Sequence, residues 1–385
     1  MKIKKIALAL FAGLVSFISV NATEQYDSIV GVIKNKYIPD SRVALWTVKT
    51  HKGNDGVLVL KGKTDNKEAR AELLSEMKNN GIEYKDSIQL LPEASLDTKW
   101  GLISISVACM RKTAASSSEL ISQTILGTPV KVLERGGDMS LIQTPDNYLG
   151  YITNNSLTFI TTSEMEAWKA SKRLVVTQRE INVYSEPNED DMKIVSDLLL
   201  GNIVIYKDAK KKFYKIALPD GREGFVKKSN VEFLDEWAKQ KFSDKLLEKN
   251  AIKMMGRPYL WGGMSSKTMD CSGFVKTLYF SNGIILQRDA SQQALTGEKI
   301  NPNNWKTDAK KGDLIFIGTK TGKVTHVAMY LENGKYIHSS GRVKVNSMDK
   351  ESEDYHVYNY LSMSRINGQV GTKGIVAVKS HPWYF

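Results

Sequence analysis

One of the two cysteines has neighbours that suit a nucleophile. Cys271 lies in the stretch Met-Asp-Cys-Ser-Gly-Phe-Val at 269–275, and apolar residues continue at helical spacing beyond it. This pattern predicts a helix that begins at Cys271, with Asp270 as its N-cap. A thiol in the first helical turn lies near unpaired backbone N–H groups and the positive end of the helix dipole, which favours the thiolate. The other cysteine, Cys109, lies in an apolar run and fits a buried structural thiol better.

Two histidines occupy positions from which they could serve this cysteine. A thiolate nucleophile needs an imidazole that stabilises the ion pair and protonates the leaving amine, and the sequence contains five histidines. Two of these, His326 and His338, lie in strand-like runs joined by Glu-Asn-Gly at 332–334. The sequence therefore predicts a hairpin with one histidine on each arm.

The length of the hairpin loop decides whether the two histidines lie on one face, because side chains alternate between the faces of a sheet. A two-residue Asn-Gly turn would place them on opposite faces. A three-residue loop, with Gly334 in the left-handed conformation, pairs Leu331 with Lys335 and places His338 within one same-face step of His326. We predict the three-residue loop and, with it, a catalytic Cys-His-His set.

The chain upstream of this set contains an internal repeat. Residues 121–127 (Ile-Ser-Gln-Thr-Ile-Leu-Gly) match residues 195–201 (Val-Ser-Asp-Leu-Leu-Leu-Gly), and the Pro-Asp pair at 145–146 recurs at 219–220 with the same offset. Each copy consists of short alternating runs separated by Gly, Pro and Asp, a pattern typical of small all-β domains.

Further elements are predicted around the repeats. Apolar spacing favours a short helix between the copies and a longer helix after the second copy. The region at 23–102 is expected to contain two strands and one helix, and its sequence suggests no function. The predicted ranges are 163–171 and 234–255 for the first two helices, 43–48 and 57–60 for the strands, and 67–80 for the third helix.

The N-terminal residues have the pattern of an export signal. Met1–Lys5 contain three lysines, an apolar run extends from Ile6 to Val20, and a small residue, Ala22, follows it. The apolar run is too short to span a bilayer comfortably, and no later stretch approaches the roughly 20 apolar residues that a spanning helix needs. We therefore expect a signal peptide at 1–22 and a periplasmic or secreted mature protein without a membrane anchor.

Composition limits the class of protein. The 385 residues suggest two to four domains, and a hydrophobic content of 42% excludes disorder as the answer for the whole chain. Two cysteines exclude a disulfide-stapled scaffold and a four-thiolate zinc site. The formal net charge is +12, or +9 without the three N-terminal lysines, which favours polyanionic surroundings. For an exported protein we expect these to be cell wall rather than nucleic acid.

The sequence lacks the motifs that other catalytic mechanisms would require. The sequence contains no His-Glu-x-x-His, Gly-x-Ser-x-Gly or Cys-x-x-Cys motif, and the lysine-containing glycine stretch at 318–324 has the wrong spacing for a phosphate loop. We therefore expect no metal and no nucleotide cofactor.

Five motifs together resemble those of the NlpC/P60 cysteine peptidases, which have a papain-like fold. They are Tyr-x-Trp-Gly-Gly at 259–263, Asp-Cys-Ser-Gly-Phe at 270–274, Lys-Gly-Asp-Leu-Ile-Phe at 311–316, His-Val-Ala-Met-Tyr at 326–330 and Tyr-Ile-His at 336–338. The two repeat copies resemble bacterial SH3-like (SH3b) domains. The resemblance implies an α+β architecture in which two small all-β SH3-like barrels, at 103–160 and 174–234, precede a papain-like catalytic domain at 240–385.

The resemblance also implies roles for individual residues. Cys271 is expected to be the nucleophile, His326 the general base, and His338 the third polar residue, which orients His326. Tyr259 and the backbone N–H of Cys271 would stabilise the oxyanion, which is usually the dominant contribution in acyl transfer.

Two SH3-like domains ahead of such a catalytic domain resemble the γ-D-glutamyl-L-diamino-acid endopeptidases of the dipeptidyl-peptidase VI type. These enzymes cleave muropeptides of the form L-Ala-γ-D-Glu-L-diamino acid, with lysine or diaminopimelate as the third residue. In that subfamily the first SH3-like domain closes the cleft, so that only a free N-terminal L-Ala fits, and an acidic residue meets its ammonium group.

Several residues match or could complete such an amine site. Asp289 matches the subfamily's amine-binding aspartate, although Ala290 stands where some members have Ser. From the SH3-like side, we expect Glu119 and Tyr148 to contribute, because the second repeat replaces them with Lys193 and Arg222. Further candidate substrate-binding residues are Tyr151, Trp261, Asp270 and Ser272.

Two other functions remain compatible with the sequence. A Cys-His-His set on a papain-like domain also suits an N-acyl amidase or a transacylase. Alternatively, the chain could be a wall-binding protein whose SH3-like pair is the functional part.

Overall fold

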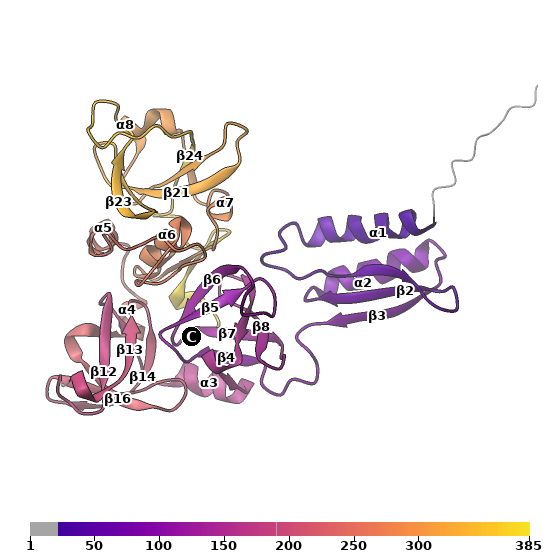
Figure 1. Ribbon diagram of the computed structural model, residues 1–385, viewed down its shortest axis with the longest axis horizontal. Coiled ribbons are helices and arrows are strands. Elements are labelled where there is room, and N and C mark those ends of the chain that lie inside the picture. The colour runs from indigo at the N-terminus through magenta and orange to yellow at the C-terminus, as the bar shows by residue number, and fades with distance from the viewer. Residues whose placement is uncertain (1–21, 190) are drawn as a thin grey trace, which may run out of the picture. The chain divides into compact units, whose positions relative to one another are not determined.

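The computed structural model describes residues 22–189 and 191–385, which divide into two compact units. One unit consists of the described residues up to Pro39 together with Trp46–Leu90, and the other of Asp40–Leu45 and Leu91–Phe385 (Figure 1). The predicted signal peptide lies outside the described residues, except for its last position. No helix in the described part of the chain is both long and apolar enough to span a membrane.

The smaller unit is a three-stranded sheet with two helices. Strand order is β1-β2-β3, and β2 and β3 are parallel because helix α2 connects them. Asn66 caps α2 by accepting a hydrogen bond from the backbone N–H of Ala69 at 2.7 Å, which confirms the helix predicted at 67–80. The bounds are α1 Ala22–Tyr37, β1 Lys49–Lys52, β2 Leu58–Thr64, α2 Lys67–Asn79 and β3 Tyr84–Leu90.

The strand predicted at 43–48 is wrong. Within this range only Trp46 forms a β-bridge, to Thr64. The preceding residues belong to the larger unit, where the carbonyl of Arg42 accepts a hydrogen bond from the backbone N–H of Leu149 at 2.8 Å. Alternation of apolar residues could not reveal that this short run is shared between two folded units.

The larger unit contains two seven-stranded antiparallel sheets with the same strand order. The first runs β6-β5-β9-β8-β7-β4-β10 and the second β13-β12-β16-β15-β14-β11-β17. Corresponding strands begin 73 or 74 residues apart, so the internal repeat found in the sequence is a repeat of topology. The first copy contains β4 Trp100–Ile103, β5 Val107–Arg111, β6 Leu120–Ile125, β7 Pro129–Glu134, β8 Met139–Gln143, β9 Leu149–Thr153, η1 Asn154–Ser156 and β10 Leu157–Ile160. The second contains β11 Arg173–Val176, β12 Glu180–Tyr184, η2 Asp191–Lys193, β13 Ile194–Leu199, β14 Ile203–Lys210, β15 Phe213–Ala217, β16 Glu223–Lys227, η3 Lys228–Asn230 and β17 Val231–Phe233.

Helices follow each copy. Between the copies, α3 (Thr162–Ala170) confirms the short helix predicted at 163–171, and it begins with a capping box in which Thr161 and Glu164 exchange hydrogen bonds. After the second copy, the predicted single helix at 234–255 is wrong, because the chain forms α4 (Leu234–Trp237) and α5 (Asp244–Lys253). Ser243 caps the second of these and so starts a new helix, which the apolar spacing did not show.

The catalytic-type domain packs helix α6 (Cys271–Phe280) against a six-stranded sheet with the order β19-β24-β20-β21-β22-β23. Phe274, Val275 and Leu278 of the helix join Phe316 and Val327 of the sheet in one buried core. The remaining bounds are β18 Ile284–Leu286, α7 Ala290–Gln293, β19 Glu298–Ile300, η4 Pro302–Asn304, α8 Trp305–Asp308, β20 Leu314–Gly318, β21 Val324–Tyr330, β22 Lys335–Ser340, β23 Arg342–Ser347, β24 Tyr360–Arg365, β25 Ile375–Ala377 and η5 Val378–Ser380.

A shared apolar core joins the three domains of the larger unit. It combines side chains from both SH3-like sheets and their helices with side chains of the catalytic-type domain and the C-terminal segment. In Figure 1 this segment runs back to the first SH3-like sheet, where Trp383 packs edge-on against Trp100 with ring centroids 5.2 Å apart. The members of this junction core are Leu102, Ile160, Met165, Trp168, Val175, Ile203, Leu234, Trp237, Ala238, Ile285, Val378 and Tyr384.

Candidate active site

Cys271 begins helix α6, as the sequence predicts. Asp270 caps this helix, because its Oδ1 accepts a hydrogen bond from the backbone N–H of Gly273 at 2.7 Å. Cys271 is only 7% exposed, whereas Cys109, for which the sequence predicts burial, is exposed. The helix and strand β21 are packed together, and the backbone N–H of Val327, the residue after His326, hydrogen bonds to the Cys271 thiol.

Burial changes the ionisation that the helix position alone would favour. It raises the pKa of the Cys271 thiol to about 11, with a further contribution from the nearby Asp270 carboxylate and opposing hydrogen bonds from the Val327 and Ser272 backbone. The thiol, rather than the thiolate expected from the helix N-terminus, is therefore the favoured form at neutral pH. Desolvation outweighs the dipole at this position.

The hairpin that carries the two histidines has the predicted three-residue loop. Leu331 donates its backbone N–H to the carbonyl of Lys335 at 2.9 Å, and Gly334 has a φ of 76°. The register pairs Met329 with Ile337 and Tyr330 with Tyr336, which brings the two histidines to the same face.

The two imidazoles are in direct contact. Nε2 of His326 lies 2.7 Å from Nδ1 of His338, and Nε2 of His338 lies 2.9 Å from Oδ1 of Asn346. The Asn346 amide is itself oriented, because its Nδ2 donates to the carbonyl of Asp354 at 3.1 Å. Since Oδ1 only accepts, His338 donates through Nε2 and accepts through Nδ1. His326 must then donate through Nε2, which leaves its Nδ1 free to accept a proton.

Sequence reasoning missed Asn346, which lies in the strand after the hairpin. The sequence gives little indication of this role, because the Asn346 amide reaches His338 only through the pairing of β22 with β23.

Burial lowers the pKa of His326 to about 3, with a smaller effect from His338. Burial also lowers the pKa of His338 to about 4, although its hydrogen bond to Asn346 opposes this. Both rings are therefore neutral at physiological pH.

Cys271 opens onto a cleft of about 700 Å³ between the first SH3-like domain and the catalytic-type domain. This volume falls within the usual range of ligand sites. All seven residues predicted to bind substrate line it, together with the predicted oxyanion residue Tyr259. These are Glu119, Tyr148, Tyr151, Tyr259, Trp261, Asp270, Ser272 and Asp289.

Two contacts cross the cleft from the first SH3-like domain. Glu119, which directly precedes β6 and forms an ion pair with Lys112, accepts a hydrogen bond from the indole N–H of Trp261 at 3.2 Å. Tyr148 donates its hydroxyl hydrogen to Oδ2 of Asp289 at 3.1 Å. Of the residues predicted for an amine site, Tyr148 and Asp289 are thus in direct contact, whereas Glu119 lines the same cleft but bonds to Trp261, which is 62% exposed.

Asp270 and Ser272 are engaged by a buried arginine that sequence reasoning missed. Arg288 donates from Nη2 to Asp270 Oδ2 at 2.6 Å and from Nη1 to Ser272 Oγ at 2.9 Å. Its Nε reaches Ser122 of the first SH3-like domain at 2.9 Å. Arg288 therefore fixes the N-cap of the cysteine helix against the neighbouring domain, and its role depends on contacts between distant stretches of the chain.

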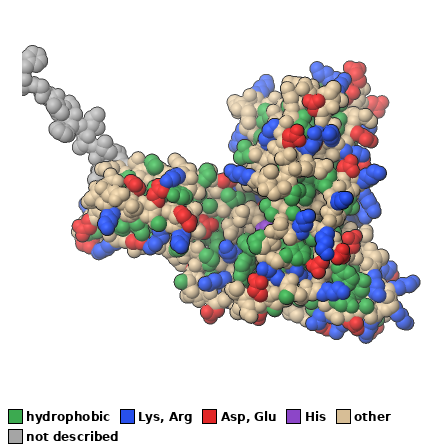
Figure 2. Space-filling view, turned by 180° about the vertical axis from the view of Figure 1, so that it is seen from behind, with side chains coloured by type: hydrophobic (Ala, Val, Ile, Leu, Met, Phe, Trp, Pro, Cys, Tyr) green, Lys and Arg blue, Asp and Glu red, His purple; other side chains and the backbone are tan. Residues whose placement is uncertain are grey.

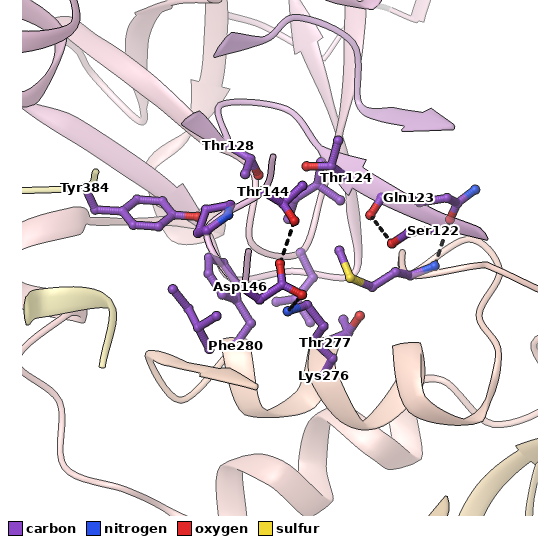
Figure 3. Close-up of a pocket in the computed structure, with 15 residues that line it drawn as sticks. Ser122, Gln123, Thr124, Thr128, Thr144, Asp146, Lys276, Thr277, Phe280 and Tyr384 are labelled. Carbon is purple, nitrogen blue, oxygen red and sulfur yellow. Dashed lines mark hydrogen bonds and ion pairs between the residues drawn. The ribbon is translucent and has the colours of Figure 1, made fainter. Parts of the chain in front are cut away.

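A second, much smaller cavity of about 50 Å³ lies between the same two domains (Figure 3). Lys276 of helix α6 forms an ion pair with Asp146 at 2.9 Å there, and Thr144 donates to the same carboxylate at 2.7 Å. This buried pair holds the cysteine helix against the SH3-like domain. The volume admits a water molecule or two rather than a peptide.

The described residues contain no group of three or more His, Cys, Asp or Glu side chains that could hold a metal ion.

Family models match two parts of the chain. Residues 256–365 match the NlpC/P60 family, and residues 110–157 match the bacterial dipeptidyl-peptidase Sh3 domain. A γ-D-glutamyl-L-lysine dipeptidyl-peptidase of Bacillus cereus is 31% identical over 238 residues, which is 58% of this chain and 68% of the relative. Dipeptidyl-peptidase 6 of Lysinibacillus sphaericus is 28% identical over 255 residues, which is 62% of this chain and 88% of the relative.

The fold has a counterpart among solved structures. An NlpC/P60 family protein from Bacillus cereus superimposes with a TM-score of 0.60 and 22% identity, covering 69% of this chain and 99% of that one. The chain belongs to the NlpC/P60 family, a family of peptidases and peptidoglycan hydrolases, and combines that domain with SH3-like domains. The expected α+β architecture, with all-β SH3-like units ahead of a papain-like domain, is confirmed.

Proposed function

We propose that this protein is an exported cysteine peptidase that cleaves the γ-D-Glu–L-diamino acid bond of cell-wall peptides with a free N-terminal L-Ala. The proposal rests on the observation that one cleft contains both a thiol and a carboxylate. Cys271 lies in it beside the strand of the His326–His338 pair, and Asp289 with the Tyr148 hydroxyl lies in the same cleft. A thiol nucleophile and a carboxylate for an ammonium group are what such a substrate requires.

The first half of the proposed reaction forms an acyl-enzyme. His326 accepts the Cys271 proton through Nδ1 while the sulfur attacks the γ-carbonyl carbon of D-Glu. The backbone N–H of Cys271 and the Tyr259 hydroxyl stabilise the oxyanion that forms. Burial raises the pKa of Tyr259 above its ordinary value, so this hydroxyl keeps its proton and can donate. The C–N bond then breaks, and His326 gives its proton to the amine of the diamino acid, which leaves.

The second half is hydrolysis. His326 takes a proton from a water molecule, the hydroxide attacks the thioester carbon, and the collapse of the intermediate returns Cys271 and releases L-Ala-D-Glu. His338 and Asn346 orient His326 throughout, because their hydrogen-bonded chain engages Nε2 of His326 and leaves Nδ1 to accept the proton.

The relatives support the bond assignment. Their printed names describe dipeptidyl-peptidases, one of them specific for γ-D-glutamyl-L-lysine, and the SH3 model that matches this chain is named after the same activity. A cleft bounded by an SH3-like domain is consistent with removal of a dipeptide from one end of a peptide.

Mass spectrometry of peptide digests tests the proposal. The purified protein without residues 1–22 is incubated with L-Ala-γ-D-Glu-L-Lys, its diaminopimelate analogue, and each peptide acetylated on Ala; Cys271→Ala serves as the control. We expect release of the Ala-Glu dipeptide from the free peptides only, and none from the variant. Equal cleavage of acetylated peptides would reject the amine-gated site. No cleavage of any peptide would favour an amidase, a transacylase or a wall-binding role.

A further inference from the structure

A short segment from far upstream contributes to the amine end of the cleft. Residues 40–45 pack on the first SH3-like domain, where the carbonyl of Arg42 accepts from the backbone N–H of Leu149 at 2.8 Å. Asp40 is tied to the catalytic-type domain, because its Oδ2 accepts from Nε2 of Gln292 at 2.8 Å. The segment thus contacts both walls of the cleft, and Arg42 lines it.

The Arg42 guanidinium joins two carboxylates. It donates to both oxygens of Asp40, from Nε at 2.8 Å and from Nη2 at 2.7 Å. Its third nitrogen, Nη1, donates to Oδ2 of Asp289 and to Oγ of Ser291, each at 2.9 Å. Asp289 Oδ2 therefore receives both Arg42 and the Tyr148 hydroxyl, which together fix the orientation of its carboxylate.

The net charge of the cluster formed by Asp40, Arg42 and Asp289 favours the binding of a cation. Asp40, Asp289 and Arg42 together carry one net negative charge, and the neighbouring cation Arg288 is paired with Asp270. Although burial opposes it, the hydrogen bonds from Arg42 hold the pKa of Asp40 below its usual value. An ammonium group that approaches Asp289 would complete the charge balance.

The volume of the cleft indicates that the Arg42 side chain lines the cleft and does not fill it. The cleft measures about 700 Å³ with Arg42 already in place among its lining residues. A side chain that occupied the substrate position would leave much less space than a ligand of this size requires.

We propose that Arg42 is a specificity-determining positioning residue, which holds the Asp289 carboxylate in the orientation that binds the ammonium of the substrate's N-terminal residue. This inference rests on the proposed function. It adds a third chain segment, 40–45, to the two domains that build the amine site. An arginine is suited to this position because its planar fork can bond Asp40 through two nitrogens and Asp289 through the third, which a lysine cannot do.

The test compares Arg42→Met and Arg42→Lys with a matched control, Arg222→Met. Arg222 makes the same local contact as Arg42, to the aspartate two residues before it, but it lies outside the residues that line the cleft. For Arg42→Met we expect the KM for L-Ala-γ-D-Glu-L-Lys to rise about tenfold, with kcat within about twofold, since one charge-assisted positioning contact is lost. Arg42→Lys should lie between Arg42→Met and the wild type, and Arg222→Met should match the wild type.

A second readout separates positioning from general damage. The preference for the free over the acetylated peptide should fall in Arg42→Met and stay unchanged in Arg222→Met, while thermal unfolding reports whether either variant has lost its fold. A faster turnover of the free peptide by Arg42→Met would show that Arg42 blocks the site, and an unchanged KM and preference would show that it has no role. Either result overturns the inference.

A binding measurement makes the inference independent of turnover. Calorimetry with L-Ala-D-Glu, the product dipeptide, is performed on Cys271→Ala with and without Arg42→Met. We expect the Kd to rise about tenfold when Arg42 is replaced, and an unchanged Kd, or no binding to Cys271→Ala, would reject the inference. If the wild type cleaves none of the peptides but the dipeptide binds in an Arg42-dependent way, the proposed reaction fails while the amine site stands.

Discussion

Hydrogen bonds connect His326 to His338, and His338 to the side-chain amide of Asn346. Asn346 accepts a hydrogen bond from His338, and its own Nδ2 is held by the Asp354 carbonyl. A carbonyl oxygen at this point selects one tautomer of both rings without adding a charge. The tautomer of His326 is thus set by a residue that lies outside the residues lining the cleft.

Replacement of Asn346 should therefore affect turnover more than binding. In Asn346→Leu, His338 loses its acceptor and the tautomer is no longer fixed, so we expect kcat to fall roughly tenfold or more, about 1.4 kcal/mol in the activation barrier, with KM little changed. Asn346→Asp restores an acceptor and should recover part of the activity. Steady-state kinetics on L-Ala-γ-D-Glu-L-Lys measure both, and a loss confined to KM would contradict the positioning role.

The lowered histidine pKa values predict an unusual pH profile. Burial holds the pKa of His326 at about 3 and that of His338 at about 4, so both rings stay neutral as the pH falls from 7 to 5. We expect kcat/KM to be flat over this interval, whereas a general base with the ordinary pKa of about 6.5 would lose activity below that pH.

At higher pH the substrate should limit the reaction. The α-amino group of the peptide loses its proton near pH 8, so kcat/KM should fall above that value, where Asp289 no longer meets a cation. Buffers of constant ionic strength between pH 5 and 9 are suitable for the measurement. An acid limb near pH 6.5 in kcat/KM would show that His326 titrates normally.

Elements differ in how well the sequence predicts them. The helix start at Cys271 and the loop at 332–334 follow from local rules, N-capping and alternation, which act within a few residues. The range 234–255 shows where apolar periodicity fails as a predictor. The apolar spacing continues across Ser243, although this residue caps a new helix. The contact between Arg42 and Asp289 joins residues 247 positions apart, and no local pattern links such positions. The placement of Cys271 and of the two histidines could therefore be predicted from the sequence, but the contribution of residues 40–45 to the cleft could not.

The repeated Leu-Gly turn is used for contact between domains. Gly127 has a φ of +77°, and a Cβ at this position would come within 2.0 Å of the Ile203 carbonyl oxygen in the second copy. Gly201, its counterpart, faces Phe280 of helix α6, where an added Cβ would lie 2.9 Å from a ring carbon. Each copy thus places the same glycine against the domain that follows it.

Gly127→Ala should destabilise the protein by at least about 2 kcal/mol, because a left-handed conformation and a backbone clash both oppose the methyl group. Gly137→Ala in the same domain is the control, since a Cβ there would meet no atom within 4 Å. Urea unfolding of the two variants measures the difference. Equal stability would indicate that the junction between the copies relaxes freely.

At the scale of the whole molecule, the charges dispersed over the face seen in Figure 2 contrast with a buried ion pair between two domains. Figure 2 shows Lys and Arg side chains spread over the visible face and interspersed with Asp and Glu. Between the first SH3-like domain and helix α6, in contrast, Lys276 and Asp146 are 10% and 6% exposed. Burial lowers the pKa of Lys276, and the Asp146 carboxylate opposes this.

Removal of one partner of this pair should cost much more than removal of both. Asp146→Ala leaves a buried ammonium group unpaired, and we expect a loss of about 3–5 kcal/mol in the free energy of unfolding. Asp146→Ala combined with Lys276→Met should recover most of it. The exposed pair of Lys239 and Glu236 is the control, for which Glu236→Ala should cost less than about 1 kcal/mol. A double-mutant cycle by chemical denaturation measures these values, and additive losses at Asp146 and Lys276 would contradict a coupled pair.

The junction core has a consequence for any shortened form of the protein. Ile285, Val378 and Tyr384 of the catalytic-type domain are buried against Leu102, Trp168 and Val175 of the SH3-like domains and the helix between them. A fragment that begins after the second SH3-like copy would expose these apolar side chains to water as one contiguous patch, which promotes self-association. The catalytic-type domain of this chain is therefore expected to aggregate when produced alone, and solubility would return only when both SH3-like copies are present.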